Sequence, residues 1–141
     1  MTPSASQPLA IGRAALCLWI STALVLLVMT AQVLGWVPLA GSTPGMTVSI
    51  GLVTAALLGF VAASVSARRS WVRWLFAVVY VLGTLGTVVL VVLTPEVFRA
   101  LPMVLQANMI AQFILQTAAL VLMFTSTSRH WFATRHVETA P

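Results

Sequence analysis

Residues Met46 to Ala67 have the sequence MTVSIGLVTAALLGFVAASVSA, 22 residues without a charged side chain. At about 1.5 Å of rise per residue, a helix of this length covers the hydrocarbon core of a bilayer, which is about 30 Å thick. Three further apolar stretches of similar length run over Ala14–Gly35, Leu75–Leu93 and Val104–Phe124. The sequence therefore predicts an all-α integral membrane protein with four transmembrane helices.

The composition of the chain agrees with a membrane location. Of its 141 residues, 60% are hydrophobic and 6% are charged, whereas soluble domains carry about 25% charged residues. The four spans (14–35, 46–67, 75–93 and 104–124) and their connections form one membrane domain, 14–124. Residues 1–13 are expected to be a mobile tail and residues 125–141 a basic-aromatic tail. Short connections make consecutive helices antiparallel neighbours, so the expected architecture is an antiparallel four-helix bundle.

The seven basic residues are all arginines, and their placement predicts the topology. If the helices alternate in direction, the side of the membrane opposite to Arg99 holds the other six: Arg13, Arg68, Arg69, Arg73, Arg129 and Arg135. Because loops rich in arginine stay in the cytoplasm, both termini and the central connection are expected to be cytoplasmic. This bias accounts for the net charge of +5 without a nucleic-acid partner.

Two connections carry signals for the start of a helix. Thr43 followed by Pro44 predicts an N-cap with proline in the first helical position. Thr94, Pro95 and Glu96 have the same order, with an acidic group near the positive end of the helix dipole. The second signal predicts one capped helical turn between the third and fourth spans.

The second span contains small residues at every fourth position. This spacing keeps them near one face of a helix, and small residues allow helices in lipid to approach closely. The series predicts either a packing face within the bundle or the seam of a homodimer. Its members are Gly51, Ala55, Gly59, Ala63 and Ala67.

Two basic-aromatic segments flank the membrane domain on the predicted cytoplasmic side. Arginine binds lipid phosphates bidentately, and tryptophan lies at the level of the headgroups. The segments therefore predict contacts with the lipid bilayer and its anionic headgroups; docking of a partner protein on the central segment is the alternative. The expected anchors are Arg68, Arg69, Trp71, Arg73, Trp74, Arg129, Trp131 and Arg135.

The last span contains the main polar constellation within the membrane. Asn108, Gln112 and Gln116 recur at four-residue intervals, and each interval rotates by about 40°, so the three lie on one stripe. Unpaired carboxamides are unfavourable in hydrocarbon. The stripe is therefore expected to face the bundle, with Gln32 and Tyr80 as candidate partners. Three interpretations are open: interhelical hydrogen bonding, a neutral polar pocket for a small or amphipathic ligand, and an ion path.

Several functional classes require residues that this sequence lacks. Ion-coupled transporters carry an acid within the membrane, but Glu96 and Glu138 both lie outside the spans. The single cysteine, Cys17, allows no intrachain disulfide, and both histidines lie in the carboxyl-terminal tail. We therefore expect no metal, no cofactor and no enzymatic activity.

The segment Arg68–Trp74, together with Leu122–Phe124 leading into Ser128–Phe132, resembles the small uncharacterised four-helix membrane proteins of bacteria. The resemblance implies a bacterial inner-membrane location and supplies no activity. Two hypotheses about function follow. The first is a non-enzymatic interaction or accessory subunit, with a second copy or another membrane protein as partner. The second is a small transporter or permease for a neutral or hydrophobic compound, which uses the polar stripe of the last span.

Overall fold

The structure, a computed structural model, describes residues 9–37, 43–67 and 69–125, and these contain five helices. Four of them are long and apolar enough to cross a membrane, which confirms the predicted number of spans. The remaining helix, which is short, is the helical turn predicted before the last span, but the Thr94 side chain does not make the expected cap hydrogen bond. The helices are α1 (Leu9–Val33), α2 (Pro44–Ser66), α3 (Ser70–Leu93), α4 (Pro95–Ala100) and α5 (Met103–Met123).

All four long helices start earlier than the hydropathy pattern predicts, and the difference is largest for α1 and α3. α1 begins at Leu9 rather than Ala14, and α3 begins at Ser70 rather than Leu75. The predicted spans exclude Arg13 and Arg73, but arginine is a good helix former, and Ile11 and Val72 in these extensions pack in the buried core. Residues 9–13 of the predicted tail and residues 70–74 of the central connection are therefore helical.

The start of α2 follows the predicted chemistry. The Thr43 hydroxyl accepts a hydrogen bond from the backbone N–H of Met46 at 3.3 Å, and Pro44 is the first helical residue. Proline fits this position because the first N–H groups of a helix have no partner within the helix. The N-cap prediction at Thr43 is confirmed.

The end of α1 is closed by a Schellman motif. The backbone N–H of Trp36 donates to the carbonyl of Ala31 at 2.9 Å, and that of Gly35 donates to the carbonyl of Gln32 at 3.0 Å. Gly35 has a φ of 74°, a conformation that glycine adopts without the steric cost of a side chain. The chain therefore leaves the helix at a defined angle before the connection to α2.

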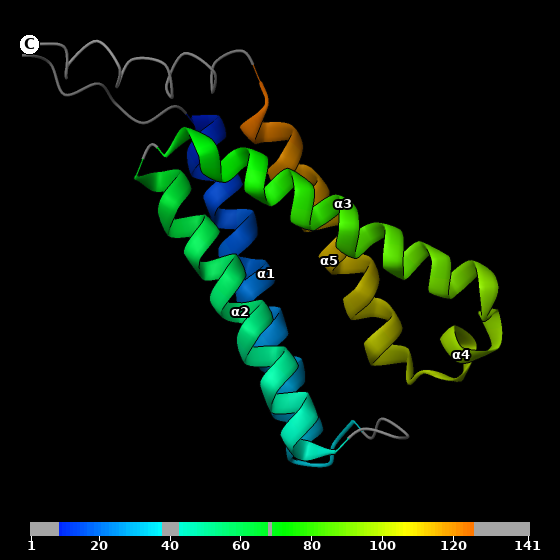
Figure 1. Ribbon diagram of the computed structural model, residues 1–141. Coiled ribbons are helices and arrows are strands. Elements are labelled where there is room, and N and C mark those ends of the chain that lie inside the picture. Colours follow the sequence, from blue (N-terminus) through cyan, green and yellow to red (C-terminus); the bar gives the residue numbers. More distant parts are fainter. Residues whose placement is uncertain (1–8, 38–42, 68, 126–141) are drawn as a thin grey trace, which may run out of the picture.

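The helices are closely packed at one end of the molecule and diverge at the other (Figure 1). We call the first the arginine end; it contains the start of α1, the α2–α3 connection and the end of α5. The other, the open end, contains the start of α2 and α4. α1 contacts α2 and α5 extensively, whereas α3 makes far fewer contacts with α2 and α5. The buried core of the arginine end includes Ile11, Leu18, Val61, Val65, Val72, Phe76 and Met123.

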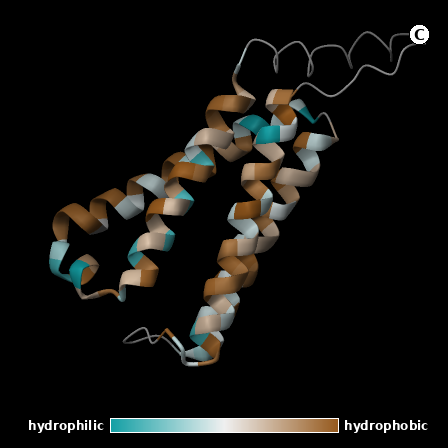
Figure 2. Cartoon of the chain, turned by 180° about the vertical axis from the view of Figure 1, so that it is seen from behind, coloured by the Kyte–Doolittle hydropathy of each residue, from teal (hydrophilic) through white to brown (hydrophobic). Residues whose placement is uncertain are grey.

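Of the four long helices, α3 has the least buried surface. Only 6% of its most apolar window is buried inside the molecule, against 33% for α2. A Cβ atom added to Gly83 or Gly86 would meet nothing within 4 Å. Figure 2 shows hydrophobic residues along most of α3, with hydrophilic residues near the α2–α3 connection and at α4. The distal half of α3 therefore forms one side of an opening in the bundle.

Candidate functional site

Three side chains form a hydrogen-bonded connection between α1 and α5, which we call the polar joint. Ser21 is fully buried; its hydroxyl donates to Oε1 of Gln112, and its backbone carbonyl accepts from Nε2 of Gln112 at 2.9 Å. Nε2 of Gln116 donates to the Ser21 hydroxyl at 3.3 Å and to Oε1 of Gln112 at 3.1 Å. The joint connects the middle of both helices through groups that are costly to leave unpaired in hydrocarbon.

A second polar contact connects α3 to α5. Tyr80 Oη lies 2.6 Å from Thr117 Oγ1, and Thr117 Oγ1 donates to the backbone carbonyl of Phe113 at 2.6 Å. Because a threonine hydroxyl has one hydrogen, the Tyr80 hydroxyl must be the donor in its bond to Thr117. Tyr80 thus connects α3 to α5 by a hydrogen bond between side chains.

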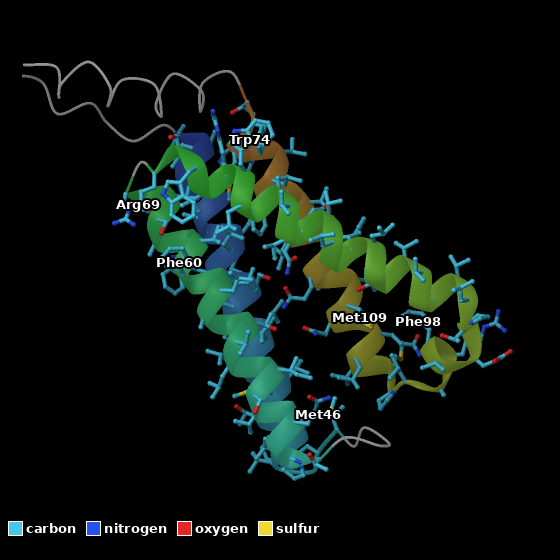
Figure 3. The ribbon with its side chains drawn as sticks, viewed as in Figure 1. Met46, Phe60, Arg69, Trp74, Phe98 and Met109 are labelled. Carbon is cyan, nitrogen blue, oxygen red and sulfur yellow. The ribbon has the colours of Figure 1, made fainter. Side chains whose placement is uncertain are left out.

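Two cavities lie between the helices. The larger, of about 470 Å³, is bounded by α2, α3 and α5, with Leu58, Phe76 and Met109 among its apolar walls. The smaller, of about 280 Å³, is bounded by α1, α2 and α5. Thr54 and Asn108 line both cavities, so the two spaces adjoin at these residues. Figure 3 shows Met109 on the wall formed by α5, between the arginine end and the open end.

Asn108 lies one helical turn before Gln112 on α5. Its Oδ1 atom is buried and has no hydrogen-bond partner. Most buried carbonyl oxygens accept at least one hydrogen bond, and leaving such a group unpaired costs about 1–3 kcal/mol. The structure therefore contains an unpaired acceptor where the two cavities adjoin.

The structure brings the predicted stripe of α5 to the wall of a single cavity. Asn108, Gln112 and Gln116 all line the larger cavity, and Tyr80 lines it from α3. Gln32 lines the smaller cavity with Asn108. The hydrogen-bond partners differ from the expected ones, because the stripe bonds to Ser21 rather than to Gln32 or Tyr80.

The small residues of α2 differ in burial along the helix. A Cβ built on Gly51 would lie 2.6 Å from Sδ of Met29, whereas a Cβ built on Gly59 would lie 3.8 Å from the ring of Trp19. Side chains of α1 therefore lie closer to α2 at Gly51 than at Gly59. Each four-residue interval rotates by about 40°, so the end of the series turns away from α1. Burial accordingly decreases along the series. Gly51 and Ala55 are buried, Gly59 is partly buried, and Ala63 and Ala67 are exposed.

The described basic-aromatic residues gather at the arginine end, where Figure 3 shows Arg69 and Trp74. Arg69 is exposed, and Trp71 and Trp74 are 51% and 60% exposed. The Arg73 guanidinium lies 5.8 Å from the centre of the Phe124 ring, and the rings of Trp74 and Phe124 are 5.2 Å apart. The remaining predicted anchors, Arg68, Arg129, Trp131 and Arg135, lie outside the described residues.

Sequence reasoning missed two residues of this site, Ser21 and Thr117. Ser21 is followed by Thr22 in the middle of an otherwise apolar span, and polar residues at that depth usually face the interior of a bundle. The position of Ser21 could therefore have indicated that it faces the interior. Its partner could not be identified from the sequence, because Ser21 and Gln112 are 91 residues apart and no local spacing relates them.

The site consists of neutral groups, namely hydroxyls and carboxamides that donate and accept hydrogen bonds. Within the described residues, no group of three or more His, Cys, Asp or Glu could hold a metal ion. No protein-family model, curated protein or solved structure matches the chain. The arrangement of groups in the site is suited to binding uncharged polar groups in an apolar surrounding.

Proposed function

We propose that this chain is a non-enzymatic multi-pass membrane protein that binds a neutral or hydrophobic compound between its helices and acts as a small permease. The supporting observation is the cavity of about 470 Å³ between α2, α3 and α5, whose walls combine apolar side chains with uncharged polar groups. Small-molecule sites commonly have volumes of about 300–1,000 Å³ and this mixture of groups. Uncharged walls favour an uncharged compound.

The divergence of α3 supports access from the bilayer. α2 and α3 separate with distance from their connection (Figure 1), and Gly83 on the wall of the cavity presents no side chain. A compound dissolved in lipid therefore reaches the cavity between these two helices without crossing a ring of charges. This route suits hydrophobic compounds better than strongly hydrated ones.

Two glycines of α3 provide a matched test. A Cβ fits at Gly83 and at Gly86 without a contact within 4 Å, but only Gly83 is on the wall of the larger cavity. Gly83→Phe is expected to place a ring in that cavity and reduce uptake of neutral compounds into liposomes that contain the full chain, while Gly86→Phe retains it. Absence of flux through the unsubstituted protein over a broad panel of neutral compounds would refute the permease function.

The second candidate is an interaction or accessory subunit, and the exposure of α3 favours it. Gly83 and Gly86 lie on a helix that buries 6% of its apolar window, and glycine lets the backbone of another helix approach closely. On this hypothesis a partner protein, or a second copy, packs on α3 and closes the opening. Co-purification from native membranes in mild detergent tests it. Here Gly86→Phe should reduce recovery of the partner, whereas the permease hypothesis expects no effect.

We further propose a bacterial inner-membrane location with the arginine end in the cytoplasm. Arg13, Arg69 and Arg73 lie at this end in the structure, whereas Arg99 lies on α4 near Glu96. The positive-inside rule favours this orientation, and exposed Trp71 and Trp74 support contact with lipid headgroups. A reporter fused after Pro141 should stay in the cytoplasm; its export would contradict the orientation.

A further inference from the structure

The three carboxamides of the α5 stripe differ in how their hydrogen-bonding groups are used. Oε1 of Gln112 accepts two hydrogen bonds, and Nε2 of Gln112 and Nε2 of Gln116 both donate to Ser21. These groups are committed to the contact between α1 and α5. Asn108, in contrast, has a buried Oδ1 without a partner, and it lines both cavities.

From this difference we infer that Asn108 recognises the ligand, and that the ligand is a lipid-like molecule with one uncharged O–H or N–H group, such as a long-chain alcohol. The inference rests on the proposed function, because it names the compound that the larger cavity takes. Gln112 and Gln116 act as positioning residues, which hold α5 and therefore Asn108 against α1.

The chemistry of Asn108 determines the polar part of the ligand. A carbonyl oxygen accepts a hydrogen bond, so its partner must be a donor. The walls of the larger cavity include Tyr80, Thr84 and Thr87 but no acidic or basic side chain. A cationic group would lack a counter-ion there, and an isolated charge in such surroundings is very costly. An uncharged hydroxyl or amide satisfies the oxygen without that cost.

The shape of the cavity determines the apolar part. On α3 its wall extends from Phe76 to Val88, a distance of roughly 18 Å at 1.5 Å per residue. Asn108 lies roughly 8 Å from the start of α5 on the same scale, toward the open end. The ligand's polar group therefore lies toward the open end, and its apolar body extends along Leu58 and Val61 of α2 toward the arginine end.

A comparison of two probes tests the inference on the full chain in bilayer nanodiscs. The probes are 1-hexadecanol and 1-methoxyhexadecane, which differ in that the ether has no hydrogen to donate. A net hydrogen bond changes affinity by about two- to tenfold, so the protein should bind the alcohol more tightly than the ether by that factor. The Asn108→Leu variant should bind both probes with the affinity that the unsubstituted protein has for the ether.

Gln106→Leu is the matched control for this substitution. It also removes a carboxamide from α5, but Gln106 bonds to the backbone carbonyl of Leu101 at 2.9 Å and is on the wall of neither cavity. This variant should keep the preference for the alcohol. Without a probe, Asn108→Leu should unfold at a temperature equal to or above that of the unsubstituted protein, because leucine replaces an unpaired acceptor. A lower unfolding temperature would show that Asn108 is structural and overturn the inference.

The outcomes separate the inference from the function on which it rests. Equal binding of alcohol and ether by the unsubstituted protein would overturn the recognition role of Asn108 and leave a cavity for neutral compounds. A preference that persists in Asn108→Leu would do the same. Binding of neither probe, with no flux in liposomes, would overturn the proposed function together with the inference. The alcohol–ether comparison on the unsubstituted protein needs no variant to fold.

Discussion

Replacing Ser21 with alanine should weaken the connection between α1 and α5 by an amount that follows from its hydrogen bonds. The substitution removes two bonds of the hydroxyl, one to Oε1 of Gln112 and one from Nε2 of Gln116. The bond from Gln112 to the backbone carbonyl of Ser21 remains, as does the bond between Gln112 and Gln116. Side-chain hydrogen bonds between membrane helices contribute about 0.6 kcal/mol on average and up to about 1.7 kcal/mol. The expected loss of stability is therefore about 1–2 kcal/mol.

Gln112→Leu should cost more, because it removes three hydrogen bonds and leaves the buried Ser21 hydroxyl without its acceptor. We expect a loss of about 2–3 kcal/mol. In the double variant, alanine at position 21 removes the hydroxyl that Gln112→Leu leaves without an acceptor. The two substitutions together should therefore destabilise the protein by about 1 kcal/mol less than the sum of their separate effects.

Thr22→Val is the matched control for Ser21→Ala. Thr22 is also buried, but its hydroxyl bonds within its own helix, to the carbonyl of Leu18 at 2.9 Å. Loss of that hydroxyl breaks no contact between helices, so the change in stability should be smaller than that of Ser21→Ala. Reversible unfolding in detergent micelles, followed by circular dichroism, measures the stability of all four variants against that of the unsubstituted protein. Equal effects of Ser21→Ala and Thr22→Val, or strict additivity in the double variant, would refute the polar joint as a stabilising contact.

Substitutions at four further positions test the helix contacts and ends by the same unfolding measurement. Gly51→Ala should lower the stability by about 1–3 kcal/mol, because the alanine Cβ would lie 2.6 Å from Sδ of Met29. Gly59→Ala, with ordinary contacts, should leave the stability unchanged or raise it by up to about 1 kcal/mol. An equal loss at both positions would contradict the close approach at Gly51. Gly35→Ala should lower the stability by about 1–2 kcal/mol, because φ is 74° at this position. An unchanged midpoint of unfolding would argue against the Schellman motif. Thr43→Ala should lower the stability by about 1 kcal/mol, because it removes the N-cap hydrogen bond. Thr43→Ser should keep most of that stability, because serine retains the hydroxyl.

The number of membrane helices could be predicted because it depends on a local property of the chain. Each long run of apolar residues is sufficient to form a helix in lipid, and Thr43 and Pro44 mark a helix start within a few residues. The separation of α3 from α2 at the open end could not be predicted. It depends on how side chains from different helices fit together, and hydropathy contains no information on that fit.

The candidate site was partly predictable for the same reason. The spacing of Asn108, Gln112 and Gln116 on one helix predicts a common stripe, and the structure places all three on one cavity wall. Their partner depends on which helix lies opposite, so Ser21 could not be assigned from sequence spacing. The four-residue series of α2 shows a related limit, because Ala63 and Ala67 have rotated away from the face that Gly51 occupies.

The polar joint consists of one hydroxyl and two carboxamides. This composition determines how the contact between α1 and α5 responds to the transmembrane voltage. A transmembrane voltage acts on charge, at about 2.3 kcal/mol per elementary charge per 100 mV. Hydroxyls and carboxamides have no net charge and do not titrate in the physiological range. The contact between α1 and α5 should therefore have the same strength in respiring and de-energised cells.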